Sequence, residues 1–333
     1  MAIAAGGILG LRPAKAQERE AGPRPAASPK PGSGASFGPL KQIDAGVLNI
    51  GYVESGPAQG PAVILLHGWP YDIHSYAEVA PLLAAKGYRV IVPHLRGFGT
   101  TRFLSGATSR NGQQAALAMD TVALMDALKI QRAILAGYDW GGRTADIIAA
   151  LWPERCKALV SVNGYLIVDR ERNKLPLPPQ IEHGWWYQYY FATERGRAGY
   201  DKNRRDFVNL MWKLNSPKWN FDERTFERSM PSFDNPDHVG IVIHNYRWRL
   251  SLVEGEARYD ELEKRLAAGP VIAAPAITLD GDSDGVVPAT DGMSYAGKFS
   301  GKRSHRILKG IGHNVPQEAP RAFADAVIEV DGY

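Results

Sequence analysis

The sequence predicts an α/β protein whose mostly parallel sheet is flanked by helices and interrupted by an inserted helical cap. Three observations support this fold class. Short apolar runs alternate with helical segments along the chain. Polar motifs follow directly after several of the apolar runs. Finally, the stretch 164–270 lacks strong strand-like runs and is crowded with Trp, Tyr and Arg.

The elements of the first half follow in order. Residues 47–53 predict an early strand, and residues 62–66 form a continuous apolar run typical of a strand buried on both faces. Residues 77–85 predict a helix, and residues 88–92 the next strand. Residues 113–128 predict an amphipathic helix, because one stripe collects Leu117, Thr121, Leu124, Met125 and Leu128.

The later elements continue this alternation around the cap. Residues 132–136 predict a strand that leads into a helix over 143–152, and residues 158–162 predict the following strand. The single cysteine, Cys156, excludes an internal disulfide, and we expect it to be a buried structural thiol. Strands over 276–279 and 304–308 and a helix over 321–328 close the chain. The domain prediction is a core over 38–163 and 271–333, with a cap over 164–270 above the carboxyl ends of the strands.

The N-terminus predicts an export signal remnant over residues 1–16. Residues 1–11 are apolar, and Ala14-Lys15-Ala16-Gln17 is similar to a cleavage signal. With a twin-arginine start upstream, the protein would be periplasmic or secreted. The alternative is a low-complexity tail on a cytoplasmic protein. Residues 17–37 are rich in Pro, Ala, Gly and Ser and predict a disordered linker.

Composition excludes several classes of function. The 333 residues are 44% hydrophobic and carry a net charge of +4, with basic residues scattered along the chain. The sequence has no basic stripe interleaved with aromatic residues, so we expect no nucleic-acid partner. No apolar run approaches the roughly 20 residues that a membrane span needs. Because the predicted cap is rich in aromatic residues, we expect an apolar small-molecule substrate, and we expect a monomer or homodimer.

Asp139 is the candidate nucleophile. It lies in Gly137-Tyr138-Asp139-Trp140-Gly141-Gly142, the strand, sharp turn and helix pattern of a nucleophile elbow, with Asp in the place usually held by Ser. The alternative is a helix N-cap. A carboxylate is already ionised at neutral pH, which suits displacement at an alkyl carbon such as that of an epoxide or a carbon–halogen bond.

Two further motifs supply partners for Asp139. His313 follows the last predicted strand in Gly310-Ile311-Gly312-His313 and is the candidate base. Asp284 follows the strand over 276–279 and is the favoured orienting acid, with Asp282 as the fallback. The loop after residue 66, His67-Gly68-Trp69-Pro70, predicts an oxyanion hole made by the backbone N–H groups of Trp69 and Trp140.

The chain order of nucleophile, acid and His resembles the α/β-hydrolase superfamily, and most of all its epoxide hydrolases. The resemblance runs from about Leu40 to the C-terminus and includes the cap. It implies that Tyr187, in Tyr187-Gln188-Tyr189-Tyr190-Phe191, and Tyr246, in Tyr246-Arg247, hold the epoxide oxygen. It implies no metal and no organic cofactor. Further candidates for the substrate pocket are His67, Trp186 and Tyr190, and we expect His67 to orient the oxyanion loop.

Two alternatives stay open. A haloalkane or haloacetate dehalogenase uses the same Asp nucleophile, and indole N–H groups of Trp69 and Trp140 would bind the halide. Haloacetate dehalogenases also bind the substrate carboxylate with arginines, of which Arg143 matches one while Trp140 occupies the other position. The second alternative is a non-catalytic binding protein with the same fold. Tyr138, where His is usual, and His94, where Asp is usual, indicate a divergent branch.

Overall fold

The computed structural model describes residues 37–333. The predicted export segment and all but the last residue of the predicted linker lie outside the described residues. None of the helices formed by residues 37–333 is long and apolar enough to cross a bilayer.

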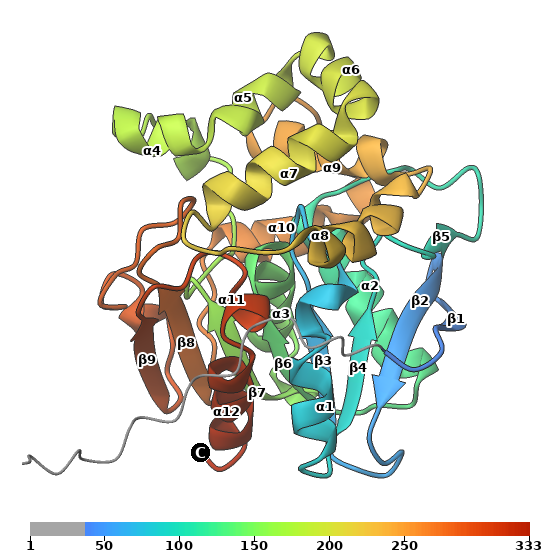
Figure 1. The fold of residues 1–333 in the computed structure, drawn as a ribbon, viewed down its shortest axis with the longest axis vertical. Coiled ribbons are helices and arrows are strands. Elements are labelled where there is room, and N and C mark those ends of the chain that lie inside the picture. The colour runs from blue at the N-terminus through green and yellow to red at the C-terminus, as the bar shows by residue number, and fades with distance from the viewer. Residues whose placement is uncertain (1–36) are drawn as a thin grey trace, which may run out of the picture. The chain divides into compact units, whose positions relative to one another are not determined.

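Nine strands form one sheet (Figure 1). They are β1 (Lys41–Ala45), β2 (Leu48–Ser55), β3 (Ala62–Leu66), β4 (Arg89–Pro93), β5 (Arg102–Phe103), β6 (Ala133–Gly137), β7 (Cys156–Val162), β8 (Ala276–Gly281) and β9 (Arg303–Leu308). Their order is β1-β2-β4-β3-β6-β7-β8-β9, and β5 pairs with β2. All pairs from β4 to β9 are parallel, and β2 pairs antiparallel with β1, β4 and β5.

Helices cover both faces of the sheet. In Figure 1, α1 (Val79–Ala84) and α12 (Pro320–Val330) lie together on one face, and α2 (Gln114–Ala127) and α3 (Asp139–Leu151) lie on the other. Every residue of β6 is buried as a result, which explains its continuous apolar sequence. The predicted mostly parallel sheet with flanking helices is confirmed.

Two strands at one edge of the sheet were not predicted. β1 has mostly exposed or half-buried residues, and its register depends on pairing with β2 across the turn at Gly46, whose φ is 59°. β5 has only two residues. Such short, polar edge strands carry little apolar periodicity, so their pairing rather than their sequence defines them.

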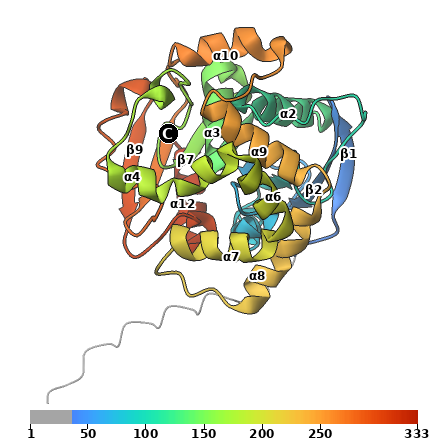
Figure 2. The same ribbon diagram turned by 90° about the horizontal axis from the view of Figure 1, so that it is seen from above.

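Six cap helices lie above the carboxyl ends of the parallel strands (Figures 1 and 2). They are α4 (Pro179–Gly184), α5 (Trp186–Ala192), α6 (Glu194–Lys202), α7 (Arg204–Asn215), α8 (Glu223–Ser229) and α9 (His238–Arg249). The predicted cap range also includes α10 (Asp260–Ala267). This helix contacts α2 and lies beside the core helices in Figure 2.

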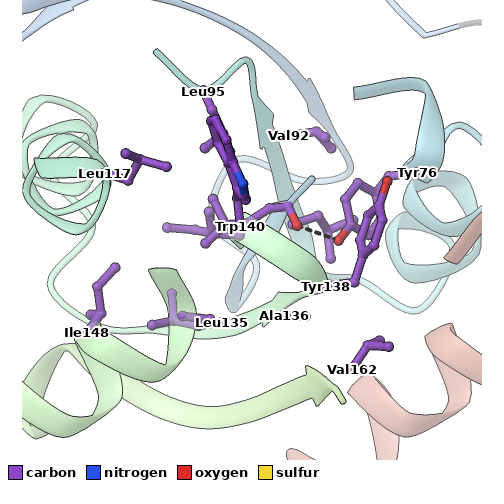
Figure 3. Close-up of a cluster of buried hydrophobic side chains, with 14 of the residues drawn as sticks. Tyr76, Val92, Leu95, Leu117, Leu135, Ala136, Tyr138, Trp140, Ile148 and Val162 are labelled. Atoms are coloured by element: carbon purple, nitrogen blue, oxygen red, sulfur yellow. Dashed lines mark hydrogen bonds between the residues drawn. The ribbon is translucent and has the colours of Figure 1, made fainter. Parts of the chain in front are cut away.

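The core packs closely around the turn between β6 and α3. In Figure 3 the ring of Trp140 lies beside Leu95, and the ring of Tyr138 lies on the other side of the turn beside Tyr76. Both rings are fully buried. Since Trp140 and Tyr138 flank Asp139, their packing holds that residue in place at the top of the sheet.

Candidate active site

The backbone at Asp139 makes a sharp turn that only small neighbours allow. Asp139 has a φ of 50°, in the left-handed region that L residues with a Cβ seldom adopt. A Cβ on Gly141 would lie 1.9 Å from the carbonyl oxygen of Leu66, and one on Gly137 would lie 2.5 Å from the carbonyl carbon of Gly141. β3, β6 and α3 can therefore meet this closely only because these positions are glycine.

The Asp139 carboxylate faces the loop after β3. Its Oδ1 accepts a 2.7 Å hydrogen bond from the backbone N–H of Trp69. Asp139 is the first residue of α3, whose N-cap is Tyr138, so its side chain is not the helix cap. The N–H of Trp140 lies in the first helical turn, where backbone donors lack intrahelical acceptors. Of the two predicted oxyanion donors, the Trp69 N–H contacts the carboxylate, and the Trp140 N–H is the next backbone donor along the chain.

His313 and Asp284 meet as a buried pair. His313 Nδ1 donates to Asp284 Oδ2 at 2.8 Å, and His313 Nε2 lies 3.8 Å from Asp139 Oδ2. Asp284 is itself fixed, since its Oδ1 accepts from the N–H groups of Val286 and Val287 at 2.7 and 3.0 Å. Asp282 is exposed, and its Oδ1 accepts from Ser283 Oγ and from the N–H of Gly310, so the geometry favours Asp284 as the orienting acid.

The electrostatics of the three groups are coupled. Burial alone would lower the pKa of His313, but Asp284 and Asp139 outweigh burial and raise it to about 10. Burial would raise the pKa of Asp139, but the hydrogen bond and charge of His313, the charge of Arg143 and the Trp69 N–H lower it below its ordinary value. The resting site at neutral pH therefore holds an ionised Asp139 beside an imidazolium.

Glu318 holds the His313 loop and was missed as a functional residue. Its carboxylate accepts from Ser216 Oγ at 2.6 Å and from the N–H groups of Gly312 and Asn314 at 2.7 and 3.0 Å. Ser216 Oγ in turn accepts from the N–H of His313 at 3.0 Å. Glu318 therefore positions His313 through its neighbours and through a cap residue. Its place just before the final helix was the available signal.

Tyr187 and Tyr246 lie together beneath the cap. Their ring centroids are 5.2 Å apart, and each is also 5.2 Å from the Trp69 ring. Burial raises the pKa of Tyr187 to about 12 and holds the pKa of Tyr246 well above its ordinary value. Both phenols stay protonated at neutral pH. The Tyr246 hydroxyl is fully buried between Tyr187 and Trp140, and it makes no hydrogen bond of good geometry among residues 37–333.

A cavity of about 670 Å³ opens beside the carboxylate. Asp139, His313 and Tyr187 line it, together with Trp185 and Gln188. His67, Trp186, Tyr190 and Tyr246 do not.

The three other pocket candidates have packing roles instead. Trp186 and Tyr190 pack on Phe207, because helical spacing turns them away from the face that carries Tyr187. His67 packs on Phe98, and its Nε2 accepts from the N–H of Leu95 at 3.2 Å. Burial lowers the pKa of His67 to about 4, so it is neutral, and it holds the oxyanion loop against residue 95.

Three indole N–H groups tie the cap to the loops that carry the site. Trp69 Nε1 donates to the Tyr200 hydroxyl at 3.0 Å. From α7, Trp212 Nε1 donates to the carbonyl of Pro70 at 2.6 Å, next to Trp69. Trp185 Nε1 donates to the carbonyl of Val286 at 3.0 Å, next to the Asp284 turn.

The Trp69 indole is fixed by a longer chain of hydrogen bonds. The Tyr200 hydroxyl that it contacts donates to His238 Nε2 at 2.8 Å, and His238 Nδ1 donates to the carbonyl of Gly97 at 2.8 Å. Burial lowers the pKa of His238 to about 3, which keeps this ring neutral. The indole N–H of Trp69 therefore already has a hydrogen-bond acceptor in the cap. The Trp140 Nε1 has no hydrogen-bond partner among the described residues.

Comparison with known proteins agrees with this architecture. The family model for the alpha/beta hydrolase fold matches residues 61–320. An epoxide hydrolase of Caballeronia sordidicola is 26% identical over 316 residues, which cover 87% of this chain and 93% of that protein. A haloalkane dehalogenase of Mycobacterium marinum is 33% identical over 225 residues, which cover 64% and 71%. The crystal structure of a candidate epoxide hydrolase from Klebsiella pneumoniae is 59% identical, with a TM-score of 0.87, and covers 88% and 97%.

Proposed function

The chain belongs to the α/β hydrolase fold family and is a hydrolase, and from this premise we propose that it converts an epoxide to a vicinal diol. The observation that carries the proposal is the meeting of three kinds of group at one site. These are an ionised carboxylate, a His–Asp pair and two protonated phenols. Ring opening needs a nucleophile and a proton donor for the departing oxygen, and both are present.

In the first step Asp139 opens the ring. Because Oδ1 is held by the Trp69 N–H, Oδ2 is the oxygen that attacks the epoxide carbon. The carbon–oxygen bond of the ring breaks as the new ester bond forms. The ring oxygen takes a proton from Tyr187 or Tyr246 and leaves a phenolate, which regains a proton later in the cycle. The intermediate is a hydroxyalkyl ester of Asp139.

In the second step water hydrolyses that ester. Esterification removes the negative charge of Asp139, which is one of the interactions that raise the pKa of His313. His313 then loses its proton more readily and takes one from water as it attacks the ester carbonyl. The developing charge falls on Oδ1, where the N–H groups of Trp69 and Trp140 stabilise it. Collapse releases the diol and restores the carboxylate.

The alternatives fit the site less well. A halide site made by two indoles would need the indole N–H of Trp69, which donates to the Tyr200 hydroxyl instead. A halide also leaves as an anion that needs no proton, so a dehalogenase would not use the two buried, protonated phenols as proton donors. A non-catalytic binding protein would not need His313 to hold an Asp pair and lie 3.8 Å from the carboxylate of Asp139.

The test is to trap the intermediate with His313→Gln. This variant should form the ester and fail to hydrolyse it. Incubation with styrene oxide, 1-bromohexane and chloroacetate should give a single adduct on the Asp139 peptide, heavier by the full mass of styrene oxide. The matched control is the double variant with Asp139→Asn, which should give none.

The masses of the adducts separate the alternatives. A hexyl or carboxymethyl adduct would identify a dehalogenase. If no adduct forms and the wild-type protein turns over neither these three compounds nor the charged epoxide 3,4-epoxybutanoate, the proposal is contradicted.

A further inference from the structure

Two arginines line the cavity with no carboxylate partner of their own. Arg143, on α3, is buried, and its Nε donates a hydrogen bond to the carbonyl of Leu166 at 2.9 Å. Arg249, the last residue of α9, has a buried Nε that makes no hydrogen bond. Among residues 37–333 neither guanidinium forms an ion pair. Arg143 is buried and feels the charge of Asp139, whereas Arg249 is half-buried and its guanidinium lies 5.6 Å from the centroid of the Tyr246 ring. A buried cation without an ion pair is unusual.

The sequence spacing sets where the two arginines stand relative to the reacting groups. Arg143 follows the nucleophile Asp139 by four residues on α3, and Arg249 follows Tyr246 by three residues on α9. Residues three and four apart lie on one helix face, about one 5.4 Å turn from each other. Each arginine is therefore one turn beyond a group that acts on the epoxide.

The ionised side chains that line the cavity include four arginines and lysines against two acids, Asp139 and Asp169. Arg172 and Lys298 also line it, and Lys298 donates to the carbonyl of Gly269 rather than to an acid. Burial, followed by the charge of Arg249, lowers the pKa of Arg143 to about 10. Two guanidinium groups that repel each other in a buried site destabilise the empty protein, and a bound anion would offset that cost.

We propose that the substrate carries a carboxylate, which Arg143 and Arg249 bind while Asp139 attacks a carbon about one helical turn away. The substrate class is thus a short epoxy acid, in which two or three bonds separate the carboxylate from the epoxide. The predicted apolar substrate becomes a substrate with an apolar middle and a charged end. The two arginines support carboxylate binding. The inference that the electrophile is an epoxide depends on the proposed function.

Binding tests the site without any chemistry. We would titrate Asp139→Asn protein with butanoate and with butanamide, which have nearly the same shape and differ in charge. Charge-assisted hydrogen bonds should make butanoate bind on the order of 10- to 100-fold more tightly. In that background Arg143→Gln and Arg249→Gln should each remove most of the preference. Arg195→Gln is the matched control, because Arg195 is exposed on α6 and does not line the cavity.

The outcomes separate this inference from the epoxide hydrolase proposal. Equal affinity for the two probes overturns the carboxylate site, and so does a preference that survives both arginine substitutions. Turnover of 3,4-epoxybutanoate with a higher kcat/KM than 3,4-epoxybutanamide supports both proposals. If butanoate binds selectively but neither epoxide labels Asp139 in His313→Gln, the carboxylate site holds and the proposed reaction is wrong.

Discussion

At the scale of the residue, the two phenols distinguish ring opening from other uses of an Asp nucleophile. Tyr187 and Tyr246 are buried, and their raised pKa values keep their protons in place at neutral pH. An alkoxide is a poor leaving group, so loss of both donors should slow ring opening much more than it weakens binding.

We expect Tyr187→Phe and Tyr246→Phe each to lower kcat, and the double variant to lower it by about 10²- to 10⁴-fold. Tyr189→Phe is the matched control, because Tyr189 lies on the same helix but is exposed and bonds to Glu182. Steady-state kinetics with styrene oxide checks this. Full activity in the double variant would show that the phenols only pack.

The charge of His313 should also change during the cycle, and this predicts opposite pH responses of the two steps. Ring opening needs ionised Asp139, whose pKa is lowered, so its rate should be flat above about pH 5. Ester hydrolysis needs neutral His313. The pKa of about 10 in the free protein should fall once Asp139 is esterified, so hydrolysis should accelerate with rising pH.

Rapid quench with intact-mass detection measures the amount of ester at each pH. We expect the ester to accumulate at pH 5 to 6 and to vanish near pH 9. The reverse trend, with more ester at high pH, would contradict the assignment of His313 as the base in hydrolysis.

At the scale of the element, the elbow depends on how closely α3 approaches β3. We expect Gly141→Ala to be severely destabilising, because its Cβ would overlap the backbone of Leu66 at 1.9 Å. Gly142→Ala is the matched control, since the nearest atom to its Cβ would be the side-chain Cδ1 of Leu166 at 3.0 Å and the nearest backbone atom the carbonyl oxygen of Gly137 at 3.4 Å. Thermal unfolding of the two purified variants measures the difference. Similar melting temperatures would show that the elbow can relax.

The sequence reveals a residue when a motif at the end of a strand fixes its place. It does not reveal which face of a helix points into the cavity. Asp139, Asp284 and His313 each follow a strand within a short motif, so their positions come from the chain itself. Arg249 could not be found in this way, because its place in the cavity depends on how separate segments pack. Glu318 had a signal in its position before the final helix, but its contact with Ser216 depends on how the cap packs on the core. Trp186 was misplaced for the same reason: an aromatic run on a helix does not reveal which ring faces the cavity.

At the scale of the whole molecule, buried ionisable groups should narrow the pH range of greatest stability. Burial lowers the pKa of His67 to about 4 and that of both His94 and His238 to about 3. These rings are neutral when folded but take up protons below about pH 6.5 when unfolded. Stability should therefore fall as the pH drops below that value, by up to about 1.4 kcal/mol per pH unit for each ring.

The alkaline side should respond through the groups with raised pKa values. His313, with a pKa of about 10, and Asp146, which burial raises to about 8, both hold protons in the folded state that the unfolded chain has released. Their stabilisation is fully present at low pH and is lost as the pH rises, from about 4 to 8 for Asp146 and from about 6.5 to 10 for His313. Urea unfolding from pH 4 to 10 should peak near pH 6 to 7. His313→Gln should flatten the alkaline decline, and an unchanged decline would contradict the raised pKa.

The indole bonds between the cap and the core have a consequence for how this protein can acquire new specificity. Trp212 bonds to the loop of Trp69, and Trp185 bonds to the loop of Asp284. Replacing the cap with that of a relative would therefore remove anchors of the oxyanion loop and of the acid loop together with the old binding surface. Such chimaeras should fail unless both indoles are transplanted. Gradual substitution inside the cavity is thus an easier evolutionary route to a new substrate than exchange of the cap.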